Sequence, residues 1–175
     1  MTESSQAMSA VQGAGQRTAV FPGSFDPPTY GHLDLLDRAL DLFGSVVIAI
    51  GKNSDKRSLF EVEERIALLE ACVTPGAQVK VRSFDGLLVD WCRREGLGPI
   101  VRGVRNGLDF EYERAMALHN RTMAPEVDTV FLMPRAEHSF TSSSLLREIV
   151  RAGGDARPWL PAPVLAAMHE KASRG

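Results

Sequence analysis

The 175-residue sequence is poor in cysteine and lacks any long apolar run. Its two cysteines, Cys72 and Cys92, have no metal-ligand spacing, so we interpret them as reduced core thiols of a cytoplasmic protein. A helix that crosses a bilayer needs about 20 mostly apolar residues. No segment of the sequence approaches that length, and we therefore predict no membrane partner.

An excess of either charge is also missing, since 20 lysines and arginines stand against 22 aspartates and glutamates. A protein that binds nucleic acid through a generally basic surface needs a clear positive excess. The balance of charge therefore predicts no nucleic-acid partner. Any phosphate-binding site in this chain must be local.

The length of the chain favours one globular domain, which we place at residues 18–175. Residues 1–17 are rich in Ser, Gln, Ala and Gly, and they lack the apolar stretch and the basic cluster of a signal peptide. We interpret these residues as a disordered leader.

Short β-prone runs alternate with amphipathic segments throughout the domain. Residues 46–50 are all apolar, as in a strand covered on both faces, and the apolar residues of 31–43 recur at helical spacing. The alternation predicts an α/β fold, a single-domain, Rossmann-like open parallel sheet with helices on both faces and ligands beyond the carboxyl ends of its strands. A capping box at Ser58–Glu61 is expected to open the second helix. We expect strands at 18–21, 46–50, 79–81, 99–101 and 128–132, and helices at 31–43, 61–73, 87–95, 110–123, 142–151 and 163–171.

The stretch FPGSFDPPTYGH, residues 21–32, joins the first strand to the first helix. It offers a hydroxyl at Ser24, a glycine at Gly31 and the imidazole of His32 close to a helix start, where unpaired N–H groups and the helix dipole favour a phosphate. On the residues alone, an ordinary N-cap at Thr29 and an ordinary first-turn residue at His32 are the favoured explanation.

Two arginines, Arg102 and Arg105, follow the apolar strand expected at 99–101. Their planar guanidinium groups suit phosphate oxygens, although loop arginines are also common as surface charges. Lys56, in the loop after the second strand, has by composition alone the character of a solvated lysine.

Acidic and hydroxyl side chains gather at two further helix starts. The acidic residues of DFEYE, 109–113, are explained by the helix dipole, and no carboxylate pair has a spacing that demands a metal site. The three serines at 142–144 include an expected N-cap. Leu87 and Leu88 are explained by core packing.

Two motifs resemble the signatures of the nucleotidyltransferase superfamily. They are Thr29-Tyr30-Gly31-His32 at the first helix start and the hydroxyl-rich run TSSSLLR at 141–147, which ends in a basic residue. Within the superfamily the chain is similar to the phosphopantetheine adenylyltransferases from about Thr18 to its C-terminus. The motifs that carry this similarity are PGSFDP at 22–27, Lys56, RGVR at 102–105, DFEYE at 109–113, NR at 120–121 and FLMP at 131–134. Ser24 stands where many members carry Thr, His138 stands where Trp is common, and residues 1–17 have no counterpart in the family.

The resemblance implies an enzyme that transfers the adenylyl group of ATP to 4′-phosphopantetheine, with Mg²⁺ entering on ATP and no dedicated metal ligand in the protein. It implies catalytic roles for Ser24, Lys56, Arg102 and His32, the last as a transition-state stabiliser, and acceptor binding by Ser24, Lys56, Leu88 and Arg102. It implies ATP binding by Ser24, Phe25, His32, Gly103, Val104, Arg105, Glu113, His138, Ser139, Phe140, Thr141, Ser142, Ser143 and Ser144.

The resemblance also implies a homohexamer and feedback by coenzyme A. Two other functions stay open at this point. One is a different small-molecule nucleotidyltransferase, of the nicotinate-mononucleotide adenylyltransferase or cytidylyltransferase type. The other is a nucleotide-sensing protein that has the fold without turnover.

Overall fold

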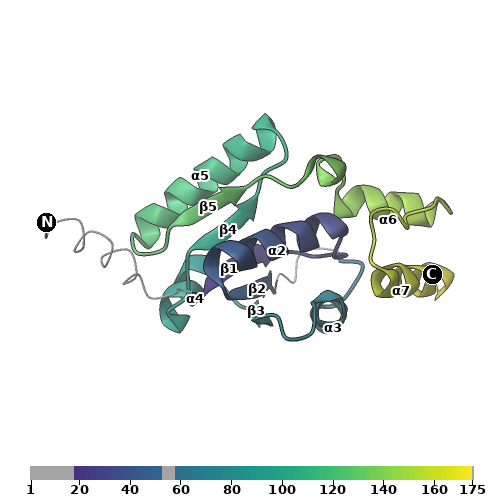
Figure 1. Cartoon of the computed structure of the whole chain (residues 1–175), viewed down its shortest axis with the longest axis horizontal. Helices are drawn as coiled ribbons and strands as arrows, with labels where there is room; N and C mark the ends of the chain where they lie inside the picture. Colours follow the sequence, from purple (N-terminus) through teal and green to yellow (C-terminus); the bar gives the residue numbers. More distant parts are fainter. Residues whose placement is uncertain (1–17, 53–57, 175) are drawn as a thin grey trace, which may run out of the picture.

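The computed structural model describes residues 18–52 and 58–174 (Figure 1). The leader expected at 1–17 and the site residue Lys56 lie outside the described residues. The described part alternates strands and helices along the chain, as the sequence predicts.

Five parallel strands form one sheet in the order β3-β2-β1-β4-β5. This order confirms the predicted Rossmann-like open sheet. The first strand lies in the middle, and successive crossovers move first toward one edge and then, after β3, toward the other. In such sheets the carboxyl ends of the two strands at the reversal, here β1 and β4, border a crevice that binds ligands. The strands are β1 (Ala19–Gly23), β2 (Val46–Gly51), β3 (Val79–Phe84), β4 (Ile100–Gly103) and β5 (Thr129–Leu132).

Helices cover both faces of the sheet, again as predicted. Alternate side chains of a strand point to opposite faces, so Phe21 packs with Leu36 of α2 on one face, whereas Val20 packs with Trp91 of α4 on the other. Helix α5 lies along β5 (Figure 1). Between these two elements the rings of Phe110 and Phe131 meet edge to face at 5.5 Å. The helices are α2 (Tyr30–Phe43), α3 (Val62–Cys72), α4 (Leu88–Glu95), α5 (Gly107–Met123), the short 3₁₀ helix η2 (Ala136–His138), α6 (Ser143–Arg151) and α7 (Ala162–Arg174).

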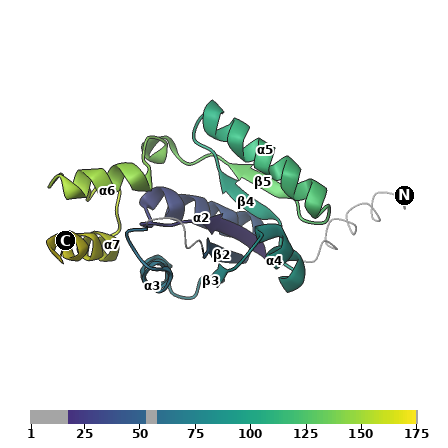
Figure 2. The same ribbon diagram turned by 180° about the vertical axis from the view of Figure 1, so that it is seen from behind.

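Helices α6 and α7 lie together at one end of the molecule, beside α3, in both views (Figures 1 and 2). A separate apolar cluster holds them, in which Phe60, Leu146 and Leu160 are almost fully buried. Lys171 of α7 also donates to Glu64 of α3 at 2.8 Å. This packing brings the start of α6 next to the crevice at the end of β1.

Several boundaries differ from the prediction by one to three residues; among them, β3 continues to Phe84, and α5 begins at Gly107 with Asn106 as its N-cap. Strand β1 continues through Pro22 to Gly23. The N–H that proline lacks would point toward β4, and β1 pairs with β4 only as far as Val20, so the strand loses no ladder hydrogen bond at Pro22. Helix α3 begins at Val62, and the Glu64 carboxylate accepts the Glu61 N–H at 2.8 Å. The capping box therefore lies three residues after the predicted one.

Candidate active site

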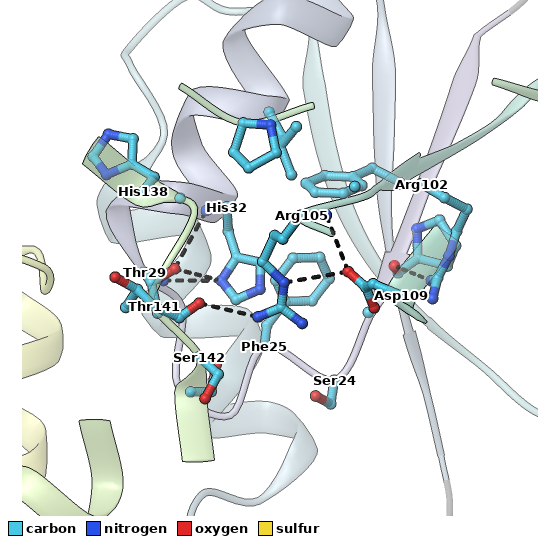
Figure 3. A pocket seen from close by; sticks show the side chains of 18 of the residues that line it. Ser24, Phe25, Thr29, His32, Arg102, Arg105, Asp109, His138, Thr141 and Ser142 are labelled. Carbon is cyan, nitrogen blue, oxygen red and sulfur yellow. Dashed lines mark hydrogen bonds and ion pairs between the residues drawn. The ribbon is translucent and has the colours of Figure 1, made fainter. Parts of the chain in front are cut away.

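A pocket of about 310 Å³ opens at the carboxyl ends of β1 and β4 (Figure 3). Its walls come from the segments that follow these two strands and from the starts of α2, α5 and α6. The structure brings many of the residues assigned from the sequence into these walls, although the assigned roles themselves stay predictions. They are Ser24, Phe25, His32, Arg102, Gly103, Arg105, Glu113, His138, Thr141, Ser142, Ser143 and Ser144.

His32 is held by Thr29, the N-cap of α2. The backbone N–H of Thr29 donates to Nδ1 of His32 at 3.1 Å, and the Thr29 hydroxyl lies 3.0 Å from the same nitrogen. Because Nδ1 accepts, the ring proton of neutral His32 sits on Nε2, at the ring edge on the Arg105 side (Figure 3). Burial and, secondarily, the positive charge of Arg105 lower the pKa of His32 to about 4. At neutral pH His32 is therefore an uncharged hydrogen-bond donor.

Phe25 supports the imidazole from the side of β1. Its ring meets His32 edge to face at 5.0 Å and Phe21 at 5.4 Å. The backbone of Phe25 has a φ of 46°, a left-handed conformation that costs a non-glycine residue about 1 to 2 kcal/mol. Gly23 leaves room for the ring, since a Cβ at Gly23 would lie 2.9 Å from it. The strained turn thus places an aromatic wall against His32.

Arg102 projects from β4 and forms an ion pair with Glu113 of α5. Its Nε donates to one Glu113 oxygen at 2.6 Å, its Nη2 donates to the other, and its Nη1 donates to the Pro22 carbonyl at 2.9 Å. The Glu113 side chain is 8% exposed and that of Arg102 is 29% exposed. The family resemblance places Glu113 at ATP, whereas in the structure both of its carboxylate oxygens are bonded to Arg102.

Arg105 extends across the pocket between α5 and the segment before α6 (Figure 3). Its Nε donates to Asp109 at 3.3 Å, and its Nη1 donates to the Thr141 carbonyl at 3.0 Å. Asp109 was not assigned to the site from the sequence, because its place at a helix start explained it. Val104 lies between Arg102 and Arg105 in the sequence, but its side chain is buried. Its backbone N–H donates to the Leu132 carbonyl at 2.9 Å.

The start of α6 contributes hydroxyl groups, and Ser142 is the predicted N-cap. The Ser142 hydroxyl accepts the Leu145 N–H at 3.2 Å. Ser143 donates to the Pro27 carbonyl at 2.8 Å, which ties this helix start to the loop after β1. Ser144 accepts from Arg147 at 3.3 Å.

Asp26 was not predicted as a site residue, yet it joins three segments around the pocket. Its buried carboxylate accepts the N–H groups of Leu59 and Phe60 at 2.8 and 2.9 Å, and the guanidinium of Arg147 at 2.9 Å. An aspartate before two prolines resembles a simple turn residue in the sequence, and its partners are more than 30 residues away, so no local signal indicated this role.

Helix α2 also anchors the segment that leads to His138. The Asp34 carboxylate accepts the Arg135 N–H at 3.0 Å, and Arg38 donates to the Met133 carbonyl. His138 then packs against Gly31, where a Cβ would lie 3.4 Å from that of His138. Neither Asp26 nor Asp34 has a local signal in the sequence that indicates these contacts.

A second cavity shares Arg102 and Glu113 with the first and lies between α4 and α5. Leu88, assigned to the acceptor from the sequence, lies here. The remaining two assigned residues are outside the walls of the pocket: Phe140 is 90% exposed, and the Ser139 hydroxyl donates to the Arg135 carbonyl at 3.1 Å. The apolar side chains around this second cavity are Phe84, Leu87, Leu88, Val89, Ile100, Tyr112, Met116, Ala117 and Met123.

Residues 18–52 and 58–174 contain no helix with the length and apolar character needed to cross a membrane. Over the same ranges, no three His, Cys, Asp or Glu side chains are grouped so that they could hold a metal ion.

Comparison with known proteins places the chain in a family. Residues 20–149 match the model of the cytidylyltransferase-like family. A phosphopantetheine adenylyltransferase of Heliobacterium modesticaldum is 46% identical over 87% of this chain and 91% of its own, and one of Alkaliphilus metalliredigens is 42% identical over 89% and 99%. A solved Plasmodium falciparum nicotinic acid mononucleotide adenylyltransferase, complexed with NaAD, shares the fold at 14% identity, with a TM-score of 0.64 over 87% of this chain and 94% of its own. The chain therefore belongs to the phosphopantetheine adenylyltransferase family of cytidylyltransferase-like proteins.

Proposed function

We propose that the chain transfers the adenylyl group of ATP to the phosphate of 4′-phosphopantetheine, giving dephospho-coenzyme A and pyrophosphate in coenzyme A biosynthesis. The observation that carries the proposal is the meeting of two unlike cavities at Arg102. One is bordered by arginines and helix starts, and the other is mostly apolar. That arrangement suits an acceptor with a phosphate at one end of a long uncharged arm.

On the acceptor side, Arg102 would bind the phosphate of phosphopantetheine. Within the described residues, three of its five N–H groups have acceptors, which leaves one on each terminal nitrogen for a ligand. The uncharged arm would then lie in the apolar cavity against Leu88. Lys56 and Ser24 complete the proposed acceptor site, the former from its place in the family motif.

On the ATP side, the starts of α2 and α6 would face the phosphates. Helix starts favour anions because their N–H groups and dipole point outward. Arg105 would meet the phosphates, and the segment from His138 to Ser144 would meet the remainder of the nucleotide. Mg²⁺ would enter as MgATP, held by phosphate oxygens.

The reaction would be an in-line attack of the acceptor phosphate on the α-phosphorus of ATP. Two unit charges of like sign at 4 Å repel by about 4 kcal/mol at an effective dielectric constant of 20, so bringing two phosphates together needs several cations and donors. His32 would donate from Nε2 to the oxygens of the α-phosphate as charge develops there. The acceptor phosphate is already a nucleophile, so positioning and charge stabilisation suffice without a covalent intermediate.

Membership of the family also supports a proposed homohexamer, feedback by coenzyme A and a cytoplasmic location. Several apolar side chains of α5 are exposed in the single chain, among them Leu108 at 87% and Leu118 at 54%, which is consistent with a surface that is covered by another copy. Light scattering during gel filtration will test the assembly, and a hexamer is the expected result. Inhibition kinetics with coenzyme A will test feedback.

The experiment that tests the activity is mass spectrometry of a reaction containing the full chain, MgATP and phosphopantetheine. We expect dephospho-coenzyme A and pyrophosphate. Parallel reactions offer nicotinate mononucleotide as acceptor, or CTP in place of ATP, to test the alternative transferases. A preference for either of these, or nucleotide binding without product, would overturn the proposal.

A further inference from the structure

Helix α5 directs a carboxylate inward where a helix of this kind would normally bury an apolar residue. Within α5, whose residues are all described, Glu113 is the one buried side chain, while Leu108, Tyr112 and Leu118 are exposed. A buried carboxylate is costly unless it is paired and hydrogen-bonded. The partner of Glu113 is Arg102, which bonds both of its oxygens.

The pair fixes the direction of the Arg102 guanidinium. Glu113 occupies the edge formed by Nε and Nη2, and the Pro22 carbonyl occupies one N–H of Nη1. A planar guanidinium held at two edges has little freedom to rotate. Its remaining N–H groups therefore keep one orientation with respect to the two cavities that the pair borders.

We propose that Glu113 is a positioning residue for the acceptor: it holds Arg102 so that the remaining N–H groups meet the acceptor phosphate. This inference rests on the proposed function. It gives Glu113 a role on the acceptor side of the site, through Arg102, in addition to the place at ATP that the family resemblance implies.

The acidic residues of α5 differ in their partners, and this provides a matched control. Asp109 pairs with Arg105 across the other pocket. Glu111, two residues before Glu113, pairs with the exposed Arg114 at 3.0 Å and lines neither cavity. Glu111→Gln therefore removes a carboxylate from the same helix without touching the pair.

The test is steady-state kinetics of Glu113→Gln with each substrate varied in turn. A glutamine keeps one acceptor oxygen but presents an NH₂ group to the second Arg102 donor, so the fork is broken. We expect the KM for phosphopantetheine to rise about 10- to 100-fold, the range that corresponds to one lost charge-assisted hydrogen bond. The KM for ATP should rise by a smaller factor than the KM for phosphopantetheine, and Glu111→Gln should change neither constant.

A double-mutant cycle with Arg102→Ala separates positioning from general damage to the fold. If Glu113 acts through Arg102, adding Glu113→Gln to Arg102→Ala causes no further loss in kcat/KM for the acceptor. If Glu113→Gln does not fold, Glu113→Asp replaces it in the cycle. This variant keeps the negative charge but moves the carboxylate away from Arg102 by the length of one methylene group. An increase in the KM for ATP with an unchanged acceptor KM, or additive losses in the cycle, would overturn the inference. An inactive parental protein would overturn the proposed function and this inference together, whereas an active parent with an unaffected Glu113→Gln variant would overturn this inference alone.

Discussion

The backbone N–H of Thr29 lies 3.1 Å from Nδ1 of His32 and decides which ring nitrogen of that histidine carries the proton. A main-chain N–H can only donate, so Nδ1 must accept and Nε2 is the donor. The bond also explains why the motif Thr29-Tyr30-Gly31-His32 joins a capping residue to a histidine three positions later. Thr29 caps the helix and at the same time fixes the tautomer of His32.

We expect His32→Ala to lower kcat by about 100- to 1000-fold, as does the loss of one preorganised donor to a developing oxyanion. The affinity for ATP should change little, because the contact strengthens as the transition state forms. Stopped-time assays at saturating substrate measure kcat, and calorimetry measures ATP binding. A variant that turns over at the parental rate, or that fails only in binding ATP, would contradict this role. His32→Gln, which can still donate, should retain more activity than His32→Ala.

The lowered pKa of His32 predicts a pH dependence of stability. Its pKa is about 4 in the folded chain, below the ordinary 6.5, so between these pH values the unfolded chain binds a proton that the folded chain does not. The free energy of unfolding should therefore fall as the pH decreases from 6.5 to 4, and His32 should add no pH dependence above 6.5. Urea unfolding at several pH values, compared between the parent and His32→Gln, measures this difference. An NMR titration of His32 centred near 6.5 would refute it.

The layout of the fold could be predicted because its signals are local. The all-apolar run at 46–50 predicts a strand buried on both faces, and the amphipathic pattern at 31–43 predicts a helix with one buried face. The alternation of such segments indicates a parallel sheet. Two of the missed boundaries had distant causes. Pro22 is tolerated in β1 because of where β4 stops pairing, and α3 begins late because Asp26 binds the backbone of the preceding residues.

The residues of the candidate site were largely predictable, and their partners were not. Three carboxylates crowd the start of α5, and nothing in the sequence distinguishes their directions. In the structure, Asp109 forms an ion pair with Arg105, Glu111 with the solvent-exposed Arg114, and Glu113 with Arg102. Such pairings depend on how a helix is rotated against a sheet, which the spacing of residues along one helix cannot report.

Arg102→Ala should impair use of the acceptor more than binding of ATP, since the proposed phosphate contact comes from its guanidinium. We expect the KM for phosphopantetheine to rise at least about tenfold with little change in ATP affinity. Arg102→Lys should recover only part of the loss, because an ammonium group cannot reproduce the fork to Glu113 and the phosphate. Arg114→Ala, on the exposed side of α5, is the control. Unchanged calorimetric affinity for phosphopantetheine in Arg102→Ala would remove Arg102 from this role.

Direct transfer predicts that no adenylyl-enzyme forms. Incubation of the protein with ATP labelled in the α-phosphate, without acceptor, should leave no label on the denatured chain. Label that is stoichiometric with the protein, and that passes into product when phosphopantetheine is added, would disprove the in-line mechanism.

Replacing Asp26 by Asn should destabilise the fold and misplace the segments around the pocket. The Asp26 carboxylate is buried and accepts from Leu59, Phe60 and Arg147, which belong to two other parts of the chain. The amide NH₂ of asparagine would face donors on one side, and Arg147 would lose its counter-charge. Removing one partner of a buried ion pair costs about 3 to 5 kcal/mol, and since the Arg147 side chain is 27% exposed we expect a loss near the lower end, about 3 kcal/mol.

Urea unfolding measures the loss in Asp26→Asn, and Asp155→Asn is the matched control. Asp155 pairs with Arg157 on the surface, where water screens the charges, so its replacement should cost far less. Because Asp26 lies in the loop between β1 and α2, folded Asp26→Asn protein should also have a lower kcat than the control variant at temperatures where both are fully folded. Equal stabilities of the two variants would show that the Asp26 carboxylate does not hold these segments together.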